Sequence, residues 1–275
     1  MSLVLAYRRL AALCPELGLD AAAPGSPPGP GRTAPGWVDG ARLVDDAAAR
    51  QSWLAAEAAE IRVCYAAEAR DDVVASRALH GYLWSVCLLI SGPWYLERRV
   101  PLLRPADVLL GPGGSVRVVP GPFACLPGDP AAGSGQARVL DCEEALGAEL
   151  RRAVADHVRP LLGVLRPDLR RGTRALWGMV GDDLISGLWH LGRALGEEDH
   201  AADLATRLLP APTPPFPGGA RFRPLPDGHP GPERLTRTRI GCCMHYTIRP
   251  EETCSTCPRL RAATRAPVAA APAGA

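Results

Sequence analysis

Lysine is absent from this chain of 275 residues, and all 31 of its lysine-or-arginine positions are arginine. The absence excludes a P-loop lysine that contacts a phosphate, and a lysine Schiff base with a carbonyl or pyridoxal cofactor. The formal net charge is only +2. Such a balance argues against a protein that binds nucleic acid by neutralising phosphates, so we expect no nucleic-acid partner. Hydrophobic residues make up 47% of the chain, enough to bury a core.

Several catalytic fingerprints are also missing. The sequence has no G-x-S-x-G, no H-E-x-x-H and no P-loop, and its 133–138 stretch lacks the last glycine of a dinucleotide fingerprint. Without a nicotinamide or flavin site, any electrons that the protein uses are expected to come from a partner protein. At the N-terminus an apolar run precedes Arg8 and Arg9. A secretory signal has the opposite order, so we expect a cytoplasmic protein with reduced cysteines.

One apolar stretch is nearly long enough to cross a bilayer. Residues 78–96 contain no arginine, aspartate or glutamate. The stretch nevertheless includes His80, Gly92 and Pro93 among other polar or helix-breaking residues. This pattern favours a buried core helix. We expect no integral membrane span, and peripheral association with a membrane is left open.

The apolar periodicity predicts an α+β fold that is predominantly helical, with a small antiparallel sheet in the middle. The sheet is expected from a hairpin around Gly111–Gly114, with a third strand near residues 137–140. Helices are expected at 2–19, 44–69, 73–91 (ending at Gly92-Pro93), 143–165, 173–180, and from Asp182 or Asp183 onward. The predicted organisation has four parts. A helical α+β domain at 1–210, with its hairpin insert at 107–140, is followed by a Pro/Gly-rich linker at 211–234. A cysteine-containing segment at 235–261, which begins with extended residues 235–240, precedes a disordered tail at 262–275.

Four of the nine cysteines fall within the short segment from Cys242 to Cys257, in the pattern C-C-x10-C-x2-C. The spacing of Cys254 and Cys257 is typical of a metal knuckle. Cys242 and Cys243 are adjacent, and neighbouring side chains of an extended strand point to opposite faces. That adjacency counts against zinc, whereas a two-iron cluster accepts thiolates from a less regular arrangement. Structural zinc, and a redox dithiol or vicinal disulfide, remain alternatives.

This pattern, followed by Pro258, resembles the C-terminal motif of the FhuF-type ferric siderophore reductases. The resemblance includes Arg237 and Arg239 before the cysteine pair, Tyr246 after it, and an upstream Leu176-Trp177-Gly178 helix. The sequence departs from the family at Met244-His245, where bulky apolar and aromatic residues are more usual.

The resemblance implies a [2Fe-2S] cluster held by Cys242, Cys243, Cys254 and Cys257, in a C-terminal cluster loop. It also implies one-electron reduction of a ferric siderophore, with the electron supplied by a ferredoxin or a flavoprotein reductase. The alternatives from other classes are a zinc-stabilised binding module without catalysis and an iron–sulfur electron-transfer protein with a different acceptor.

Residues near the motif have candidate roles as well. Arg239, Arg249 and Arg259 could offset the negative charge of the cluster and raise its potential, or could be solvated surface residues. His245 could donate a hydrogen bond to sulfur or substitute as a ligand, although an exposed loop histidine is the simpler interpretation.

The remaining polar and aromatic candidates are expected to be structural. Five cysteines have no partner at metal spacing and are interpreted as small core residues: Cys14, Cys64, Cys87, Cys125 and Cys142. Trp177, Trp189 and His190 could line a siderophore pocket, but their helical spacing favours the core. Three acidic groups are interpreted as helix caps or solvated faces: Asp71-Asp72, Asp182-Asp183 and Glu197-Glu198-Asp199.

Overall fold

A computed structural model of the chain describes residues 3–21, 36–225, 234–252, 254 and 256–258. The α+β class and the predominance of helix are confirmed. The helices are α1 Leu3–Leu13, α2 Gly40–Asp45, α3 Ala47–Tyr65, α4 Asp71–Glu97, α5 Glu143–Leu169, α6 Thr173–Ala194 and α7 Glu198–Leu208, with short 3-10 helices η1 Pro15–Leu17, η2 Pro105–Asp107, η3 Pro112–Gly114 and η4 His245–Thr247.

Helix α4 is the centre of the fold. It packs against α1, α3, α5 and α6, and most of its side chains are buried. Among the described helices it is the one whose length and composition would suit a membrane span, yet 78% of its most apolar window is buried inside the protein. The burial supports the interpretation of residues 78–96 as a core helix.

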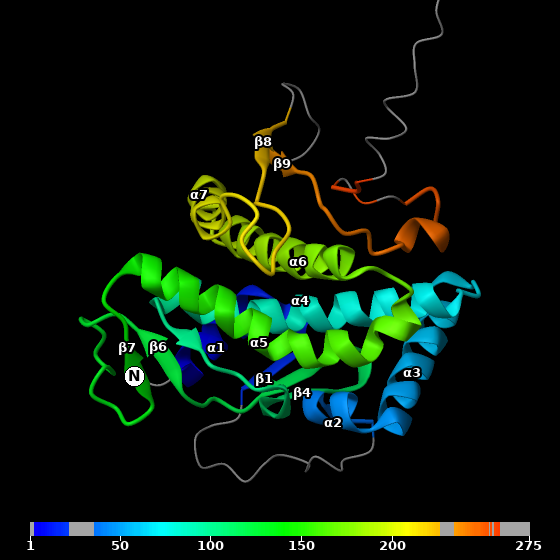
Figure 1. Cartoon of the computed structure of the whole chain (residues 1–275), viewed down its shortest axis with the longest axis horizontal. Helices are drawn as coiled ribbons and strands as arrows, with labels where there is room; N and C mark the ends of the chain where they lie inside the picture. Colours follow the sequence, from blue (N-terminus) through cyan, green and yellow to red (C-terminus); the bar gives the residue numbers. More distant parts are fainter. Residues whose placement is uncertain (1–2, 22–35, 226–233, 253, 255, 259–275) are drawn as a thin grey trace, which may run out of the picture.

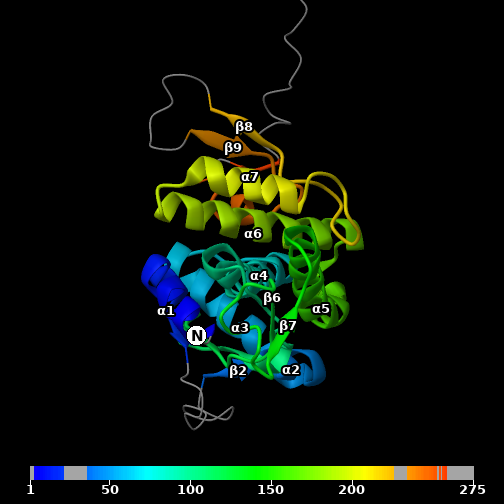
Figure 2. The ribbon, with the colours of Figure 1, turned by 90° about the vertical axis from the view of Figure 1, so that its left-hand side faces the viewer.

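The helices form layers. In Figure 1, α4 and α5 run side by side, and α6 covers them from above. Figure 2 shows α6 and α7 lying between the α4 layer and a hairpin made of strands β8 (Phe222–Pro224) and β9 (Leu235–Arg237). The C-terminal hairpin therefore rests on the outer face of the α6–α7 layer, and the main core lies beneath it.

The strands form small mixed sheets rather than one antiparallel sheet. They are β1 Leu19–Ala21, β2 Val38–Asp39, β3 Val100–Pro101, β4 Val108–Leu110, β5 Val116–Val118, β6 Phe123–Cys125 and β7 Ala137–Val139, besides β8 and β9. The predicted hairpin is present as the antiparallel pair β4–β5, with Leu109 opposite Arg117. β1 joins β5 in parallel, and the predicted third strand, β7, pairs in parallel with β6.

Several expected helix boundaries are wrong. The helix expected at 2–19 ends at Leu13 and is followed by η1 and β1, and the one expected at 44–69 spans parts of α2 and α3 and ends at Tyr65. Helix α4 does not end at Gly92-Pro93 but continues to Glu97 and closes on Arg98, whose φ is 55°. A proline removes one backbone hydrogen bond, but burial of this turn against α1 outweighs that loss, and Gly92 lets Leu10 approach closely. The two helices expected at 173–180 and from Asp182 onward are one continuous helix, α6.

The region expected to be a linker contributes to the packing where it is described. Phe216 is buried, its ring lies edge-on to Trp177, and β8 follows it. The proposed domain boundaries stay a prediction. The segment 262–275, expected to be a disordered tail, lies outside the described residues.

Candidate metal centre

The C-terminal cysteines lie in a segment that leaves β9 and runs along α6. β9 pairs with β8 in antiparallel register, Phe222 opposite Arg237. The chain then follows α6 toward the end of the molecule at which α4 and α6 begin, and forms η4 there (Figure 1). It turns back so that the backbone N–H of Arg239 donates to the carbonyl of Thr256 over 3.3 Å. This return brings the second cysteine pair beside the first.

Asp182 anchors the segment to α6. One carboxylate oxygen lies 2.7 Å from Nη2 of Arg237, and both side chains are 1% exposed. The other oxygen accepts the backbone N–H groups of Ile240 and Gly241 at 2.7 and 2.6 Å. The interpretation of Asp182-Asp183 as a helix cap or solvated face is therefore wrong. Both residues lie inside α6 and are buried, because arginines of the C-terminal segment fold over them.

Two glycines allow the segment to approach α6 closely. A Cβ added to Gly241 would lie 2.9 Å from the backbone nitrogen of Met179. A Cβ on Gly178 would lie 2.8 Å from Cγ2 of Ile240. These distances are shorter than real Cβ contacts, so the backbone of the segment could not occupy this position with larger residues. Gly178 belongs to the Leu176-Trp177-Gly178 helix that the resemblance included.

Asp183 holds a second arginine next to the thiols. Its carboxylate accepts from Nη2 of Arg239 at 2.8 Å and lies 2.9 Å from Nδ1 of His80 on α4. Burial lowers the pKa of Arg239, but the neighbouring aspartates and the thiols of Cys243 and Cys254 raise it by more, so the pKa lies above its ordinary value. The site thus contains a permanent buried positive charge beside the cysteines.

The four thiols are close enough to influence one another electrostatically. The interaction between the thiols of Cys243 and Cys254 lowers the pKa of Cys243 and raises that of Cys254. The thiol of Cys257 acts on both Cys242 and Cys254. Cys243 and Cys257 are buried, whereas Cys242 and Cys254 are partly exposed. The four predicted ligands therefore lie near one another, but among the described residues no three of their sulfur atoms form a group within 4.8 Å. One cysteine of each pair is partly exposed.

A left-handed residue resolves the difficulty posed by the adjacent cysteines. Met244 has a φ of 64°, which turns the chain sharply after Cys243. The backbone N–H of Met244 then donates to Sγ of Cys242 over 3.4 Å. The backbone N–H of His245 also helps to lower the pKa of the Cys243 thiol. Consecutive backbone N–H groups therefore lie near both sulfurs, an arrangement that would stabilise thiolates.

Arg171, at the start of the α5–α6 turn, supports the segment from the other side. Its Nη1 donates to the carbonyl oxygen of Cys242 over 2.6 Å. Burial raises the pKa of the Cys242 thiol, and the positive charge of Arg171 partly opposes this effect. A second arginine is therefore next to the cysteines, although its position in the sequence is remote from them.

These observations fit a [2Fe-2S] cluster. Four thiolates with two sulfides and two ferric ions carry net negative charge, and the site supplies cationic arginines and N–H donors to sulfur. Such groups are those by which proteins tune an iron–sulfur centre. The four cysteines remain the predicted ligands, and the geometry of a bound cluster is not part of the structure.

The other residues named around the motif occupy different positions. Arg249 is 39% exposed and pairs with Glu251 and Glu252, so its charge is already shared. Arg259 lies outside the described residues. The side chain of His245 is 17% exposed and its ring packs edge-on to Tyr65, so it is not an exposed loop histidine. A role of His245 as a ligand stays a prediction.

The structural interpretations of the remaining candidates hold in part. Cys14, Cys87 and Cys125 are buried, but Cys64 and Cys142 are exposed, because the former lies on an outward face of α3 and the latter immediately precedes α5. Trp177 and Trp189 are buried, as a core position requires.

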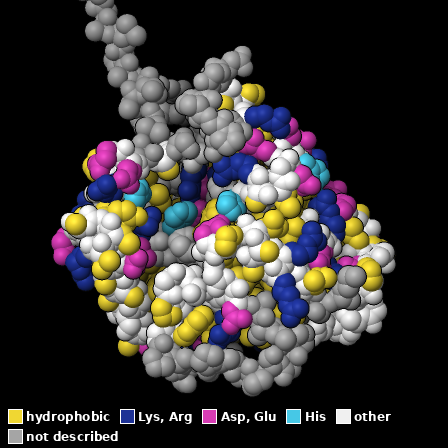
Figure 3. Space-filling view, turned by 180° about the vertical axis from the view of Figure 1, so that it is seen from behind, with side chains coloured by type: hydrophobic (Ala, Val, Ile, Leu, Met, Phe, Trp, Pro, Cys, Tyr) yellow, Lys and Arg dark blue, Asp and Glu magenta, His cyan; other side chains and the backbone are white. Residues whose placement is uncertain are grey.

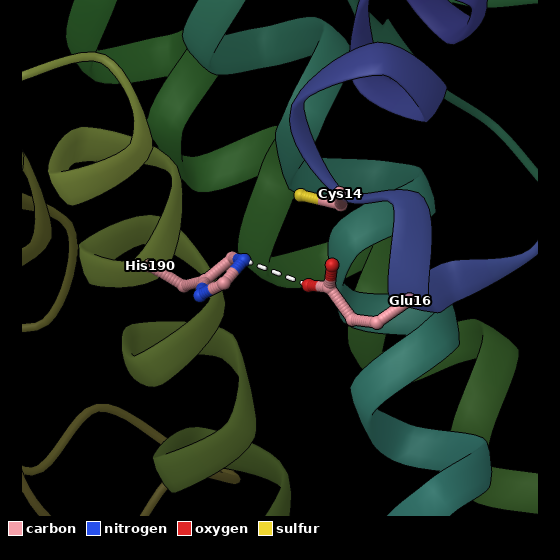
Figure 4. A group of neighbouring side chains, drawn as sticks. All are labelled: Cys14, Glu16 and His190. Atoms are coloured by element: carbon pink, nitrogen blue, oxygen red, sulfur yellow. Dashed lines mark ion pairs between the residues drawn. The ribbon is translucent and has the colours of Figure 1, made fainter.

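His190 is not a core residue. It is partly exposed, and its Nε2 lies 2.8 Å from a carboxylate oxygen of Glu16, in a group with Cys14 shown in Figure 4. This group lies on α6 and the end of α1, apart from the four C-terminal cysteines.

The acidic groups also divide. Asp71 and Asp72 occupy the first turn of α4, as expected, and Glu197 and Asp199 flank the start of α7. Glu198 is buried and accepts from the indole nitrogen of Trp189 at 2.8 Å, so it is not on a solvated face.

Sequence reasoning missed His80, Arg171 and the pairing of the two aspartates with Arg237 and Arg239. A signal for the aspartates was present, since two carboxylates interrupt an apolar face between Gly178 and Leu188. Charged residues at such positions are rarely buried without partners. His80 and Arg171 gave no comparable signal.

Comparisons with curated proteins and with solved structures give no match. A comparison with protein families gives a match over the segment that contains the four cysteines. Residues 239–259 match the family described as FhuF 2Fe-2S C-terminal domain. The resemblance is therefore confirmed for the segment that contains Cys242, Cys243, Cys254 and Cys257, which matches this family model.

Proposed function

We propose that the protein is a ferric siderophore reductase that uses a [2Fe-2S] cluster bound by Cys242, Cys243, Cys254 and Cys257. The observation that carries the proposal is the match of the segment containing these four cysteines to the FhuF 2Fe-2S family, with the thiols of Cys243 and Cys254 near the buried Arg239. Such a cluster supplies one-electron chemistry when bound, which suits the reduction of a single ferric ion.

The electron balance is simple. One electron enters from a ferredoxin or a flavoprotein reductase, and one electron leaves to the Fe(III) of the chelate. No bond of the protein forms or breaks. Siderophores bind iron through hard oxygen atoms, which hold Fe(III) strongly and Fe(II) weakly, so the reduced chelate releases its iron. The reaction belongs to the cytoplasm, where reductants of this kind are available.

The residues of the chain have distinct parts in this proposal. Cys242 and Cys254 are the partly exposed ligands, so an acceptor approaches the centre from their side. Arg239 provides a positive charge that does not titrate, held in place by Asp183. Asp182 fixes the backbone just before the first cysteine pair and so determines where the ligands begin.

The test mixes protein that has been reduced under argon with a ferric hydroxamate and a ferric catecholate siderophore in separate cuvettes. We expect the visible absorbance to return to that of the oxidised protein, with one Fe(II) trapped by a ferrous chelator for each electron. An absence of reaction with either chelate would overturn the proposal in favour of electron transfer to another acceptor. Protein that carries zinc in place of iron and sulfide would favour a zinc-stabilised binding module.

A further inference from the structure

Positive charge is concentrated where α5 ends and α6 begins. Residues 159–174 contain one acidic residue, Asp168, and five arginines: Arg159, Arg166, Arg170, Arg171 and Arg174. Within the described part of the chain, none of these arginines forms an ion pair with a carboxylate. Elsewhere pairing is common: Figure 3 shows basic and acidic side chains beside one another on the face that is seen from behind. Arg159 lies over the ring of Trp177, Arg171 donates to the carbonyl oxygen of Cys242, and the charge of Arg170 acts on Asp72, so much of the positive charge here has no ion-pair partner.

The corner is also hollowed. An open depression of about 540 Å³ is lined by Gly163, Arg166, Pro167, Arg170, Arg171 and Gly172. Its volume lies within the range of small-molecule sites. Arg166 and Arg170 are exposed, so their guanidinium groups are free to meet a ligand, whereas Arg171 is half-buried.

The depression adjoins the candidate metal centre. Arg171, which lines it, donates to the carbonyl oxygen of Cys242 over 2.6 Å. Cys242 is one of the two partly exposed cysteines. A ligand in the depression would thus lie next to an accessible ligand of the centre, which is where an electron acceptor has to bind.

We propose that this depression binds a tris-catecholate ferric chelate, so that the substrate of the proposed reductase is a polyanion rather than a neutral hydroxamate chelate. Three dianionic catecholates around Fe(III) make a trianion, whereas three hydroxamates make a neutral complex. Guanidinium groups attract the anion, and they also stack on aromatic rings such as those of catechol. The cationic corner further offsets the repulsion between an anionic chelate and an anionic centre. The inference rests on the proposed function.

The test measures binding without electron transfer, using gallium in place of iron. Ga(III) has the charge of Fe(III) but is not reduced, so a hexadentate Ga(III) tris-catecholate reports on the site alone. Calorimetry on the full-length, cluster-loaded protein should show saturable binding that weakens between about 50 and about 300 mM NaCl. Arg166→Gln with Arg170→Gln should weaken this binding roughly tenfold, since two charges next to a trianion are lost. A neutral Ga(III) tris-hydroxamate should bind more weakly, and its binding should change little with salt or with the two arginine substitutions.

The matched control is Arg8→Gln with Arg9→Gln, two adjacent exposed arginines on α1, which should leave binding unchanged. Equal binding of the trianion by the wild type and the Arg166/Arg170 variant would overturn the inference. So would a variant that is unimpaired with both chelates but is reduced more slowly by an acidic ferredoxin, because the corner would then serve a protein partner. Failure of the proposed function is distinct: the gallium trianion would bind, but no ferric chelate would oxidise the reduced protein.

A second group of side chains supports an independent inference. Cys14 at the end of α1, Glu16 in η1 and His190 on α6 direct their side chains toward one another (Figure 4). Their sulfur, oxygen and nitrogen atoms all lie within 4.8 Å of one another. The three donor types are those that zinc combines in proteins.

The group is incompletely satisfied as a set of hydrogen bonds. Nε2 of His190 is buried and, although it lies 2.8 Å from Oε1 of Glu16, the alignment does not make a hydrogen bond. The thiol of Cys14 is buried and donates to no described residue. A divalent cation between the three groups would satisfy the lone pair of His190 and stabilise the thiolate.

We infer that Cys14, Glu16 and His190 form a zinc site with three protein ligands. Glu16 and His190 are 48% and 27% exposed, which leaves a route for the ion and a position for water. The site would join η1 to α6, and the ring of Trp84 packs edge-on against His190 with the ring centroids 5.5 Å apart. It does not depend on the function of the C-terminal cysteines.

The test counts zinc in cluster-loaded protein after equilibration with Zn²⁺ and gel filtration, by mass spectrometry of the metal. We expect one zinc per chain beyond any in the C-terminal cysteines, retained by Cys125→Ser, a matched buried cysteine. Cys14→Ser and His190→Gln should each lose it, with the visible spectrum unchanged. His190→Gln replaces a partly exposed side chain and so serves if Cys14→Ser does not fold. Equal zinc content in wild type and both variants would overturn the inference.

Discussion

At the scale of single residues, the electrostatics of the candidate centre depend on Arg239. The sequence placed three arginines near the cysteines but could not rank them. The structure separates the two that it describes, since Arg239 is buried beside the thiols and Arg249 pairs with exposed glutamates. Proximity along the chain therefore did not predict proximity in space.

Arg239→Gln should lower the midpoint potential of the bound centre. Removing a buried positive charge destabilises the more negative, reduced state, by about 1–2 kcal/mol or some tens of millivolts. Arg239→Lys keeps the charge and should stay closer to the wild type. Arg249→Gln should lower the potential by less, because Arg249 is exposed and shared with two carboxylates. Protein-film voltammetry measures all of them, and equal potentials for wild type and Arg239→Gln would contradict this account.

Asp182 is the residue whose loss should most disturb the anchoring. Asp182→Asn leaves Arg237 buried without a counter-charge, so we expect a loss of about 3–5 kcal/mol in the free energy of unfolding. Urea unfolding followed by circular dichroism gives the value. Asp203→Asn, at an exposed position of α7, is the control and should change it little. A loss no larger than in that control would show that the pair does not hold the segment.

At the scale of elements, the approach of the C-terminal segment to α6 is the feature that positions the ligands. The amphipathic patterns predicted the existence of most helices, because their apolar faces form the core. They did not predict that α6 is continuous. Two adjacent aspartates are typical of a helix cap, and the sequence pattern does not show that Arg237 and Arg239 pair with them inside the helix. Likewise, Gly92-Pro93 is typical of a helix end, but α4 continues beyond it because this turn is buried against α1.

Gly241→Ala tests this approach. Its Cβ would collide with the backbone of Met179, so the segment should shift from α6, with a loss of about 1–3 kcal/mol and less iron per chain. Gly81→Ala provides a control of opposite sign. Its Cβ meets nothing within 4 Å, and alanine favours a helix, so stability should rise by about 0.5–1 kcal/mol. Thermal unfolding and iron analysis report both, and a wild-type iron content in Gly241→Ala would rule out a need for close contact.

At the scale of the whole molecule, the helical layers and the cysteine segment have separate origins in the sequence. Periodicity predicted the first, and the spacing of four thiols predicted the second. The join between them, through Asp182, Asp183 and His80, could not be predicted because each contact spans a long sequence separation. The position of the arginines at residues 159–174 could not be predicted either, because the contact of Arg171 with Cys242 also spans a long sequence separation.

The central claim is that the four C-terminal cysteines bind a [2Fe-2S] cluster, and the composition of the purified protein tests it most directly. Protein prepared under argon should be reddish-brown and contain about two iron and two acid-labile sulfide per chain. Cys254→Ser should abolish or shift the visible spectrum, whereas Cys64→Ser, at an exposed position of α3, should leave it unchanged. A colourless protein with one zinc bound by these cysteines, or a Cys254→Ser spectrum identical to the wild type, would contradict the claim.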